Sequence, residues 1–345
     1  MIDTVKIYTM INKEIYEKVK SNSIVKTSYH NSTGEIYYNI VNDHLQGSYD
    51  SSLSVRVDSG AKYGFVNQYF IEIEGSLHKI IRGYNSHNGF YNLYEVCSKL
   101  ISFVENSYNI ALPSVRHWFL QRVDIAICFD LSTQKNVINY LNNLHSCDYP
   151  RRTLRNYGDF GGTGIYYSGS STTLKIYNKY QEFKKHDLKN FKNSNFDIIN
   201  YLKTIEGFIR FEVEIKKKKL VSIYDNKYVR VRNVIYKDLK KIWCDEFMKL
   251  LKIFDNDLKK VRSKEKVEKR LNALYGNLKG SRLYNFYLSI IIDGLDIVRK
   301  RTKKSVYYRN IADLKSANID FSQKIDIDLD ECLIDFDPFS WKEVV

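Results

Sequence analysis

The chain has 345 residues, of which 43% are hydrophobic, and its 54 basic and 40 acidic residues give a formal net charge of +14. This length and apolar content exclude a disordered tail and allow a sizeable core in one or two domains. The basic excess favours a polyanionic partner, nucleic acid first, although abundant Lys, Asn, Ile and Tyr with little Pro or Ala would also follow from an AT-rich coding sequence.

The cysteines and the apolar runs bear on the compartment. Cys97, Cys128, Cys147, Cys244 and Cys332 are scattered and form no Cys-x-x-Cys pair, so the sequence predicts neither a disulfide framework nor a zinc module. The amino terminus lacks a basic segment followed by an apolar one, and no apolar run approaches membrane-spanning length. We therefore expect a cytoplasmic protein without a membrane partner.

The first part of the chain alternates between strand-like and helix-like patterns. The expected elements, in chain order, are strands at Thr4–Thr9, Tyr69–Glu74 and His78–Arg82, a helix at Tyr91–Asn106, a strand at Trp118–Phe129 and a helix at Ser132–Leu144. The second and third strands would be joined tightly at Gly75 and Ser76. This order predicts an α+β fold, a mostly antiparallel sheet with helices packed on one face.

Three later stretches place charged side chains among apolar residues at strand spacing. They are Arg122–Phe129, Thr172–Glu182 and Ile209–Lys216, and in the second of them Tyr177 would stand at the end of a strand, before a polar helix beginning at Lys179. A tyrosine with a set of acidic oxygens suits metal-assisted phosphoryl transfer, since hard divalent cations prefer carboxylates. Taken singly, none of these stretches is specific, because charged residues at every second position of a strand are usually just its solvated face.

Two basic segments could contact phosphates. Residues 151–171 combine Arg151, Arg152 and Arg155 with five glycines, and Lys216, Lys217, Lys218 and Lys219 follow the last of the three strands. The ordinary alternatives are a long hairpin loop for the first segment and a solvated strand end for the second.

The pattern becomes helical from Lys237 onward. A first helix has Trp243, Phe247 and Leu250 on its apolar face, and two others are expected at Leu283–Val298 and Val306–Ala317, separated by the basic turn Arg299–Lys304. These helices could form a helix-turn-helix DNA reader or a buttress against the sheet. We expect an α+β domain over residues 1–236, a helical DNA-binding or accessory region over 237–319, and an acidic tail over 320–345.

The ordered set of short motifs resembles the replication initiators of filamentous phages and of related plasmids and prophages, including trans-acting plasmid initiators. The motifs are Met1-Ile-Asp3, then Glu72 with Lys79 and Gly83-x-Asn85, Arg122-x-Asp124, Thr173-Leu-x-x-Tyr177-x-Lys179-x-x-Glu182, and Arg210-Phe-Glu212-x-x-Ile-Lys216. With a late segment from Ser281 to Asn318, the resemblance covers most of the chain.

The resemblance implies a rolling-circle initiator with the fold of that nuclease class. Such a protein nicks one strand at the replication origin, stays attached to the 5′ phosphate through a tyrosine, and later cuts and rejoins the strand. Its partners would be origin DNA and the host helicase and polymerase, in the host bacterial cytoplasm.

The resemblance also implies roles for particular residues. Tyr177 would be the nucleophile, a choice that composition could not make among 28 tyrosines, and Lys179 would favour its phenolate. The implied ligands of Mg²⁺ or Mn²⁺ are Asp124, Glu182 and Glu212, with Glu214 in reserve, because the seven histidines form no His-hydrophobic-His pair. Arg122 and Arg210 would clamp the scissile phosphate, or else pair with those carboxylates.

Two other functions fit the same residues. A non-catalytic origin-binding or replication-control protein would pair its carboxylates with Arg122 and Arg210 and bury Tyr177, whereas the enzyme would bring Tyr177 and the carboxylates to one exposed cleft. A related relaxase or transposase would share the nick and use another DNA target.

Overall fold

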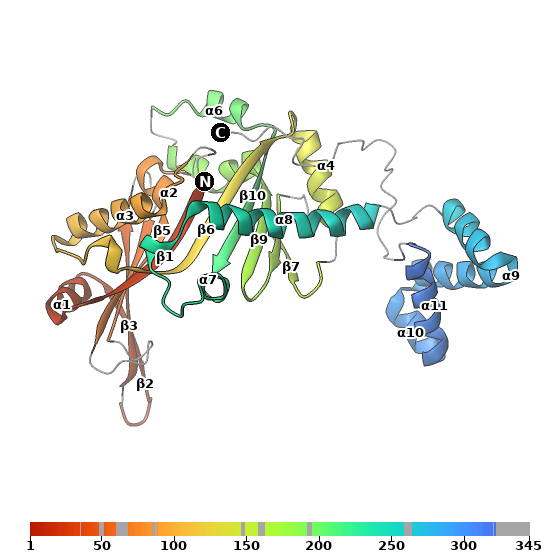
Figure 1. Ribbon diagram of the computed structural model, residues 1–345, viewed down its shortest axis with the longest axis horizontal. Coiled ribbons are helices and arrows are strands. Elements are labelled where there is room, and N and C mark those ends of the chain that lie inside the picture. The colour runs from red at the N-terminus through yellow and green to blue at the C-terminus, as the bar shows by residue number, and fades with distance from the viewer. Residues whose placement is uncertain are drawn as a thin grey trace. The chain divides into compact units, whose positions relative to one another are not determined.

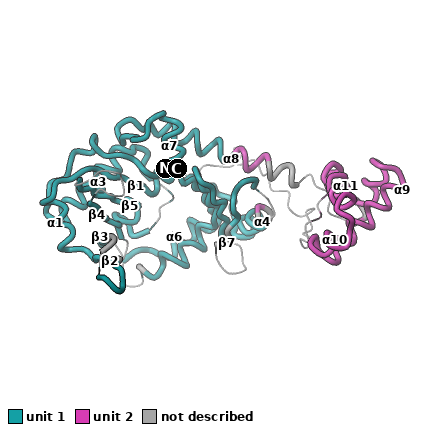
Figure 2. The backbone as a smooth tube through the Cα atoms, turned by 90° about the horizontal axis from the view of Figure 1, so that it is seen from below, with its two compact units in different colours: residues 1–142, 149–247, 337–345 teal, residues 143–148, 248–336 magenta. Residues whose placement is uncertain are grey.

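The computed structural model, whose elements are labelled in Figure 1, describes residues 1–34, 36–47, 52–59, 68–84, 87, 89–145, 149–157, 163–191, 195–258, 264–319 and 321. These residues form two compact units (Figure 2): the first contains the described residues of 1–142 and 149–247, and the second those of 143–145 and 248–321. The first unit therefore extends past the expected boundary at residue 236. The expected acidic tail lies outside the described residues, except residue 321.

The first unit is built on a ten-stranded antiparallel sheet, counted over the described residues. The strands are β1 (Ile2–Ile11), β2 (Ile24–Tyr29), β3 (Ile36–Gln46), β4 (Ser52–Asp58), β5 (Tyr69–Ser76), β6 (Phe119–Asp130), β7 (Thr153–Tyr157), β8 (Gly164–Ser168), β9 (Thr172–Asn178) and β10 (Phe208–Lys216). Each of the three charged stretches of the sequence thus contains the predicted strand, and these strands, β6, β10 and β9, lie side by side.

The strand order β2-β3-β4-β5-β1-β6-β10-β9-β8-β7 contains the same connectivity twice. In the first half, β1 lies beside β5, which is followed by β4, β3 and β2. In the second half, β6 lies beside β10, which is followed by β9, β8 and β7. The two halves meet where β1 pairs antiparallel with β6 at the centre of the sheet.

Helices cover one face of the sheet, as the α+β prediction requires. They are α3 (Leu93–Tyr108), α4 (Gln134–His145) and the first part of α8 (Tyr236–Leu258). The indole N–H of Trp243 donates to the carbonyl oxygen of Phe211 at 3.2 Å, and the ring centroids of Phe247 and Phe211 are 4.5 Å apart. Because side chains alternate along a strand, Phe211 on this face places Glu212 on the opposite face.

One predicted strand is wrong. His78–Arg82 belongs to the helix α2 (Leu77–Arg82), which follows β5 directly. The helix ends at Gly83, whose φ of +79° lets its N–H donate to the carbonyl oxygen of Lys79 at 2.8 Å. Leu77 and Ile80, three positions apart, are buried on one side of the helix, so the apolar residues follow helical spacing.

Shorter elements complete the first unit. They are α1 (Lys13–Ser21), η3 (Val115–His117), α5 (Lys179–Glu182), the π-helical turn η4 (Phe183–Asp187), η5 (Leu188–Phe191), α6 (Ile198–Thr204), α7 (Lys217–Tyr224) and η6 (Val231–Asn233). The polar helix expected from Lys179 is therefore present as α5 continued by η4. An aromatic cluster around Phe183, Phe191 and Tyr201 anchors this segment.

The second unit contains α9 (Lys264–Asp293), α10 (Leu295–Arg301) and α11 (Lys304–Ser316). Gly276, with a φ of +75°, interrupts α9, and Gly294, with a φ of +89°, separates α9 from α10. The expected helix Leu283–Val298 is thus two helices. Leu271, Leu283, Ile290 and Leu314 are among the residues of a separate apolar core.

No helix in the described ranges is long and apolar enough to cross a membrane.

Replacing Phe247 by Ala tests whether the start of α8 belongs to the core of the sheet unit. Phe247 is buried against Phe211, so we expect the free energy of unfolding to fall by about 3–5 kcal/mol. Its neighbour Met248 is 39% exposed, and Met248→Ala should cost less than about 1 kcal/mol. Urea unfolding followed by tryptophan fluorescence measures both, and equal losses would contradict this packing.

Candidate active site

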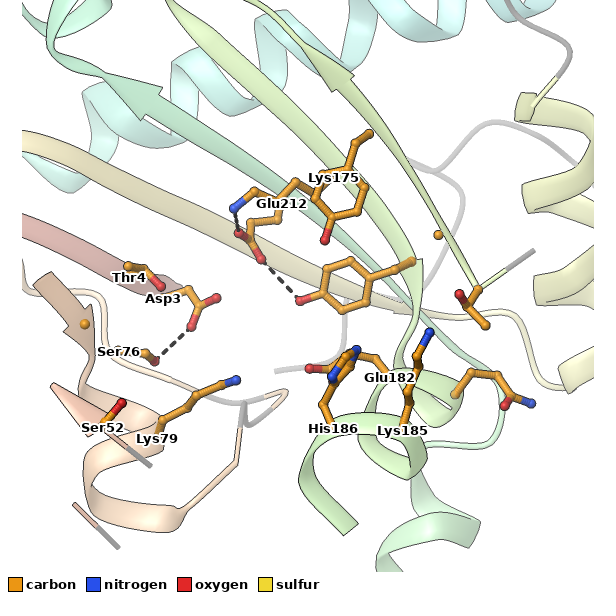
Figure 3. A pocket seen from close by; sticks show the side chains of 16 residues that line it. Asp3, Thr4, Ser52, Ser76, Lys79, Lys175, Glu182, Lys185, His186 and Glu212 are labelled. Carbon is orange, nitrogen blue, oxygen red and sulfur yellow. Dashed lines mark hydrogen bonds and ion pairs between the residues drawn. The ribbon is translucent and has the colours of Figure 1, made fainter. Parts of the chain in front are cut away.

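A pocket of about 410 Å³ opens on the sheet face opposite α8 (Figure 3). It collects side chains from segments that are far apart in the sequence: Asp3 of β1, Lys79 of α2, Lys175 and Tyr177 of β9, Glu182 of α5, Lys185 and His186 of η4, and Glu212 of β10. Three of the predicted site residues, Tyr177, Glu182 and Glu212, therefore meet at one place.

Tyr177 lies near the end of β9, where the sequence placed it, and is only 7% exposed. Its hydroxyl donates to Oε2 of Glu212 at 3.2 Å. Gly164 lies opposite on β8, where an added Cβ would be 2.9 Å from the Cβ of Tyr177. Burial raises the pKa of Tyr177 well above its ordinary value, and the Glu212 carboxylate raises it further, against the effect of Arg210. The resting hydroxyl is therefore protonated.

Lys175 bridges the carboxylates beside the tyrosine. Its Nζ lies 2.7 Å from Oε1 of Glu212, 3.0 Å from Oδ2 of Asp124 and 3.3 Å from Oε2 of Glu214. Burial alone would raise the pKa of Glu212, but Lys175 and Arg210 more than offset it and hold that pKa below its usual value. Burial would lower the pKa of Lys175, but Glu212 and Asp124 reverse this and raise it. Both groups are consequently ionised.

Asp124 does not line the pocket. Its side chain is fully buried, and Arg122 donates hydrogen bonds to both carboxylate oxygens, with Nε 2.8 Å from Oδ1 and Nη2 2.6 Å from Oδ2. Burial raises the pKa of Asp124 to about 7, while Lys175 and Arg122 act in the opposite direction. Arg122 also forms an ion pair with Glu74 at 3.0 Å. Arg122 therefore pairs with carboxylates, which was the alternative to clamping a phosphate.

Arg210 is fully buried and pairs with an acid that had no assigned role. Its Nη2 lies 3.0 Å from Oδ2 of Asp3, and its Nε lies 3.9 Å from Oε2 of Glu212. Asp3 also accepts a hydrogen bond from the Ser76 hydroxyl at 3.0 Å, and it lines the pocket. Arg210 does not, so a direct clamp on a phosphate would need the pocket to rearrange.

Lys179, which was expected beside the Tyr177 hydroxyl, does not line the pocket, whereas Lys79, for which no role was expected, does. Lys179 is fully buried, its Nζ 2.7 Å from Oε2 of Glu182, and it does not line the pocket. Lys79 of α2 does line it and points into it in Figure 3. Burial lowers the pKa of Lys79, but Asp187, Glu182 and Asp3 more than compensate and raise it. Sequence reasoning identified Lys79 only as a motif residue, because His78–Arg82 was taken for a strand.

The predicted metal ligands do not form a ready-made site. Within the described residues, no group of three His, Cys, Asp or Glu side chains is placed to hold a metal ion. Glu182 pairs with Lys179, Glu212 with Lys175 and Asp124 with Arg122. A divalent cation at these oxygens would first have to displace an ammonium or guanidinium group.

The proposed DNA-binding residues divide into engaged and exposed ones. Arg152 binds the carbonyl oxygen and hydroxyl of Thr172 and pairs with Glu246, and Lys216 donates to the carbonyl oxygen of Gly169 at 2.8 Å. The exposed ones are Arg151, at a turn, and Lys218, in α7, where Lys217 and Lys219 are half-buried. Arg155 lies in β7, and Gly158, Gly161 and Gly162 are outside the described residues.

The expectations of both functional hypotheses are partly met. Tyr177, Glu182 and Glu212 converge on one pocket, as an enzyme requires. Tyr177 is nevertheless buried, and Asp124 pairs with Arg122, as expected for a non-catalytic protein.

Comparison with known proteins identifies the family. A protein-family profile named Phage CRI, which describes the N-terminal part of a replication-associated protein, matches residues 1–234. The chain belongs to this family of replication initiators, which confirms the resemblance drawn from the motifs.

The similarity to solved and curated proteins is limited. A structure titled rolling circle replication initiator protein from Geobacillus stearothermophilus is similar, with 11% sequence identity, a TM-score of 0.27, and coverage of 63% of this chain and 73% of that chain. No curated protein sequence matches the chain.

Substituting Lys175 by Met should remove the cation that the buried carboxylates share. We expect the free energy of unfolding at neutral pH to fall by about 3–5 kcal/mol, because Glu212 and Asp124 lose their common partner. Burial raises the pKa of both carboxyl groups and Lys175 opposes this, so without Lys175 they should bind protons as the pH falls, and the variant should recover part of the lost stability. The difference between variant and wild type should therefore shrink on acidification.

Urea unfolding at neutral pH and at about pH 5 measures this difference. Lys99→Met is the matched control, since Lys99 pairs with Glu95 at 2.7 Å on the surface and should contribute less than about 1 kcal/mol. An effect of Lys175→Met no larger than that of the control would show that the buried network does not need this cation.

Proposed function

We propose that this protein is an origin-specific endonuclease and strand transferase that starts rolling-circle DNA replication through a covalent bond between Tyr177 and the 5′ phosphate. The observation that carries the proposal is the hydrogen bond between the Tyr177 hydroxyl and the ionised, pocket-lining Glu212. It occurs in a chain of a replication-initiator family. The released 3′ hydroxyl would prime the host polymerase in the bacterial cytoplasm, with a host helicase opening the duplex.

The reaction is a transesterification. The phenolic oxygen of Tyr177 attacks the phosphorus of the scissile phosphodiester, the P–Oη bond forms and the P–O3′ bond breaks. The phenolic proton passes to Glu212 as the P–Oη bond forms and is then delivered to the departing 3′ oxygen. Attack of a free 3′ hydroxyl on the phosphotyrosine reverses the same steps and rejoins the strand.

The pocket supplies cations for the phosphate. Lys79 and Lys185 line it together with Lys175, and ammonium groups balance the charge that builds on the phosphoryl oxygens. Lys79 comes from α2 and Lys185 from η4, so the scissile phosphate would lie between these two helices, next to Tyr177. This makes Lys79 a better candidate than the buried Lys179 for a group that contacts the phosphate.

A requirement for Mg²⁺ or Mn²⁺ is part of the proposal. When bound, such an ion would polarise the phosphodiester, and Glu182 is the predicted ligand with the most exposed carboxylate in the pocket. Because the described carboxylates already have cationic partners, no step of the reaction above is assigned to the ion.

A second function is favoured by the burial of Tyr177 and the Arg122–Asp124 salt bridge: a replication-control protein that binds the origin without cutting it. The two functions differ in one outcome, the formation of a covalent protein–DNA adduct.

Replacing Tyr177 by Phe should abolish both nicking and the adduct. The variant keeps the ring that packs beside Gly164 and lacks only the nucleophilic oxygen, so its fold should be intact. The purified proteins are incubated with supercoiled DNA of the replicon in Mg²⁺, Mn²⁺ or EDTA, and nicked circles and denaturation-resistant adducts are scored. Wild type should react in either metal and not in EDTA.

Tyr166→Phe and Tyr180→Phe are the matched controls, because Tyr166 also lines the pocket and Tyr180 follows Tyr177 closely in α5. Both should keep the adduct. An adduct that persists in Tyr177→Phe would show that another tyrosine is the nucleophile. Specific binding without any nick in wild type would support the replication-control function.

Replacing Glu212 by Gln tests its role as proton acceptor. The amide cannot take up the phenolic proton, so the single-turnover nicking rate should fall about 10²–10⁴-fold. In wild type, the low pKa of Glu212 and the raised pKa of Tyr177 predict a rate that changes little between about pH 6 and 9. In the variant, hydroxide must remove the proton, so the rate should rise about tenfold per pH unit.

Glu214→Gln provides the control, since Glu214 lies on the same face of β10 but does not line the pocket. Its pH profile should match that of wild type. Parallel profiles for wild type and Glu212→Gln would exclude Glu212 as the proton acceptor.

A further inference from the structure

The second unit presents a strongly basic surface on α10 and α11. Residues 295–309 contain six basic side chains and one acidic one: Arg299, Lys300, Arg301, Lys303, Lys304, Arg309 and Asp296. All six basic residues are exposed. Of these, Arg301 pairs with Asp293 at 3.1 Å, whereas in the described part of the chain no ion pair engages Lys300, Lys303, Lys304 or Arg309.

One face of α11 packs against the core of the second unit, which leaves the opposite face exposed to solvent. Tyr307, Asn310 and Leu314 are buried at helical spacing, and Tyr307 and Leu314 belong to the apolar core of the unit. The opposite side carries Lys304, Tyr308, Arg309, Ala312 and Lys315, all of which are exposed. This outer face thus carries three basic side chains, one tyrosine and one alanine, and none of these five residues is acidic.

A groove of about 390 Å³ is lined by residues of α10 and α11. It is lined by Asp296, Arg299, Lys300, Lys304, Tyr307 and Tyr308. Arg299 lies 6.0 Å from the ring centroid of Tyr308, whose side chain is 47% exposed. Three cations and one carboxylate line this groove, so an anionic ligand fits it.

We propose that α10 and α11 form a helix-turn-helix that binds duplex DNA, with the outer face of α11 in the major groove and the basic end of α10 on the phosphate backbone. The two helices pack against each other through a turn at Thr302 and Lys303. A helix whose outer face is convex and basic fits the major groove of a duplex. The inference rests on the proposed function only in that the partner is DNA, and it gives the chain a second DNA contact apart from the pocket.

The test measures binding of the full chain to a short fluorescent duplex from its own replicon by anisotropy, in EDTA. The variant Lys300→Gln/Lys304→Gln/Arg309→Gln removes three exposed charges. We expect binding at least about tenfold weaker at 0.1 M salt, and a slope of log K against log salt that is smaller in magnitude by about 2–3, since each lost phosphate contact accounts for ~0.9.

The control variant Lys264→Gln/Lys266→Gln/Arg282→Gln removes the same charge from exposed positions of α9. It should keep nearly the affinity and slope of wild type. An equal loss in both variants would mean that only net charge matters, and unchanged duplex binding by the Lys300→Gln/Lys304→Gln/Arg309→Gln variant would mean that this surface does not bind duplex; either result overturns the proposal. Because binding in EDTA involves no cleavage, the result is the same whether or not Tyr177 nicks DNA.

Discussion

The ion pairs of Lys175 hold the acidic face of the sheet together. Carboxylates from β6 and β10 approach the same ammonium within 3.3 Å, and without this cation burial would raise the pKa of Glu212 instead of leaving the group ionised. The arrangement depends on register, since Lys175 lies opposite Glu212 only while β9 and β10 pair as they do. A slip of one residue would turn Lys175 toward the helices and Tyr177 with it.

Strand periodicity made much of this fold predictable. The alternation in Arg122–Phe129 and Ile209–Lys216 predicted strands, and both stretches are strands in the structure. His78–Arg82 was misjudged because a five-residue amphipathic segment satisfies strand and helix spacing almost equally well. Gly83 was the available signal, since a glycine directly after the segment is typical of a helix end.

The candidate site was only partly visible in the sequence. Tyr177, Glu182 and Glu212 were identified, and the structure brings them to one pocket, but whether they carry out the chemistry is still a prediction. Asp3 and Lys79 were missed as pocket residues because they reach it from β1 and α2, contacts that only the folded chain creates. The pairing of Asp124 with Arg122 was one of two alternatives, and neighbouring positions on one strand could not decide between a salt bridge and a ligand.

Comparing the two halves of the sheet shows which residues of the site both halves share and which occur only in the second half. In the first half of the sheet, Arg56 on β4 lies opposite Glu72 on β5, as Lys175 on β9 lies opposite Glu212 on β10. A basic residue opposite an acidic one thus occurs in both halves of the sheet, so this pair follows from the repeated connectivity and does not by itself indicate a catalytic site.

The two halves differ two residues after the basic residue, where the first half has Asp58 and the second has Tyr177. Lys175 and Arg210 already balance the charge of Glu212, so the carboxylate does not need a phenol. A phenylalanine would bury the same ring without the cost of desolvating a hydroxyl. The hydroxyl of Tyr177 is therefore the feature that the packing of the sheet does not explain and that transfer of a phosphoryl group would require.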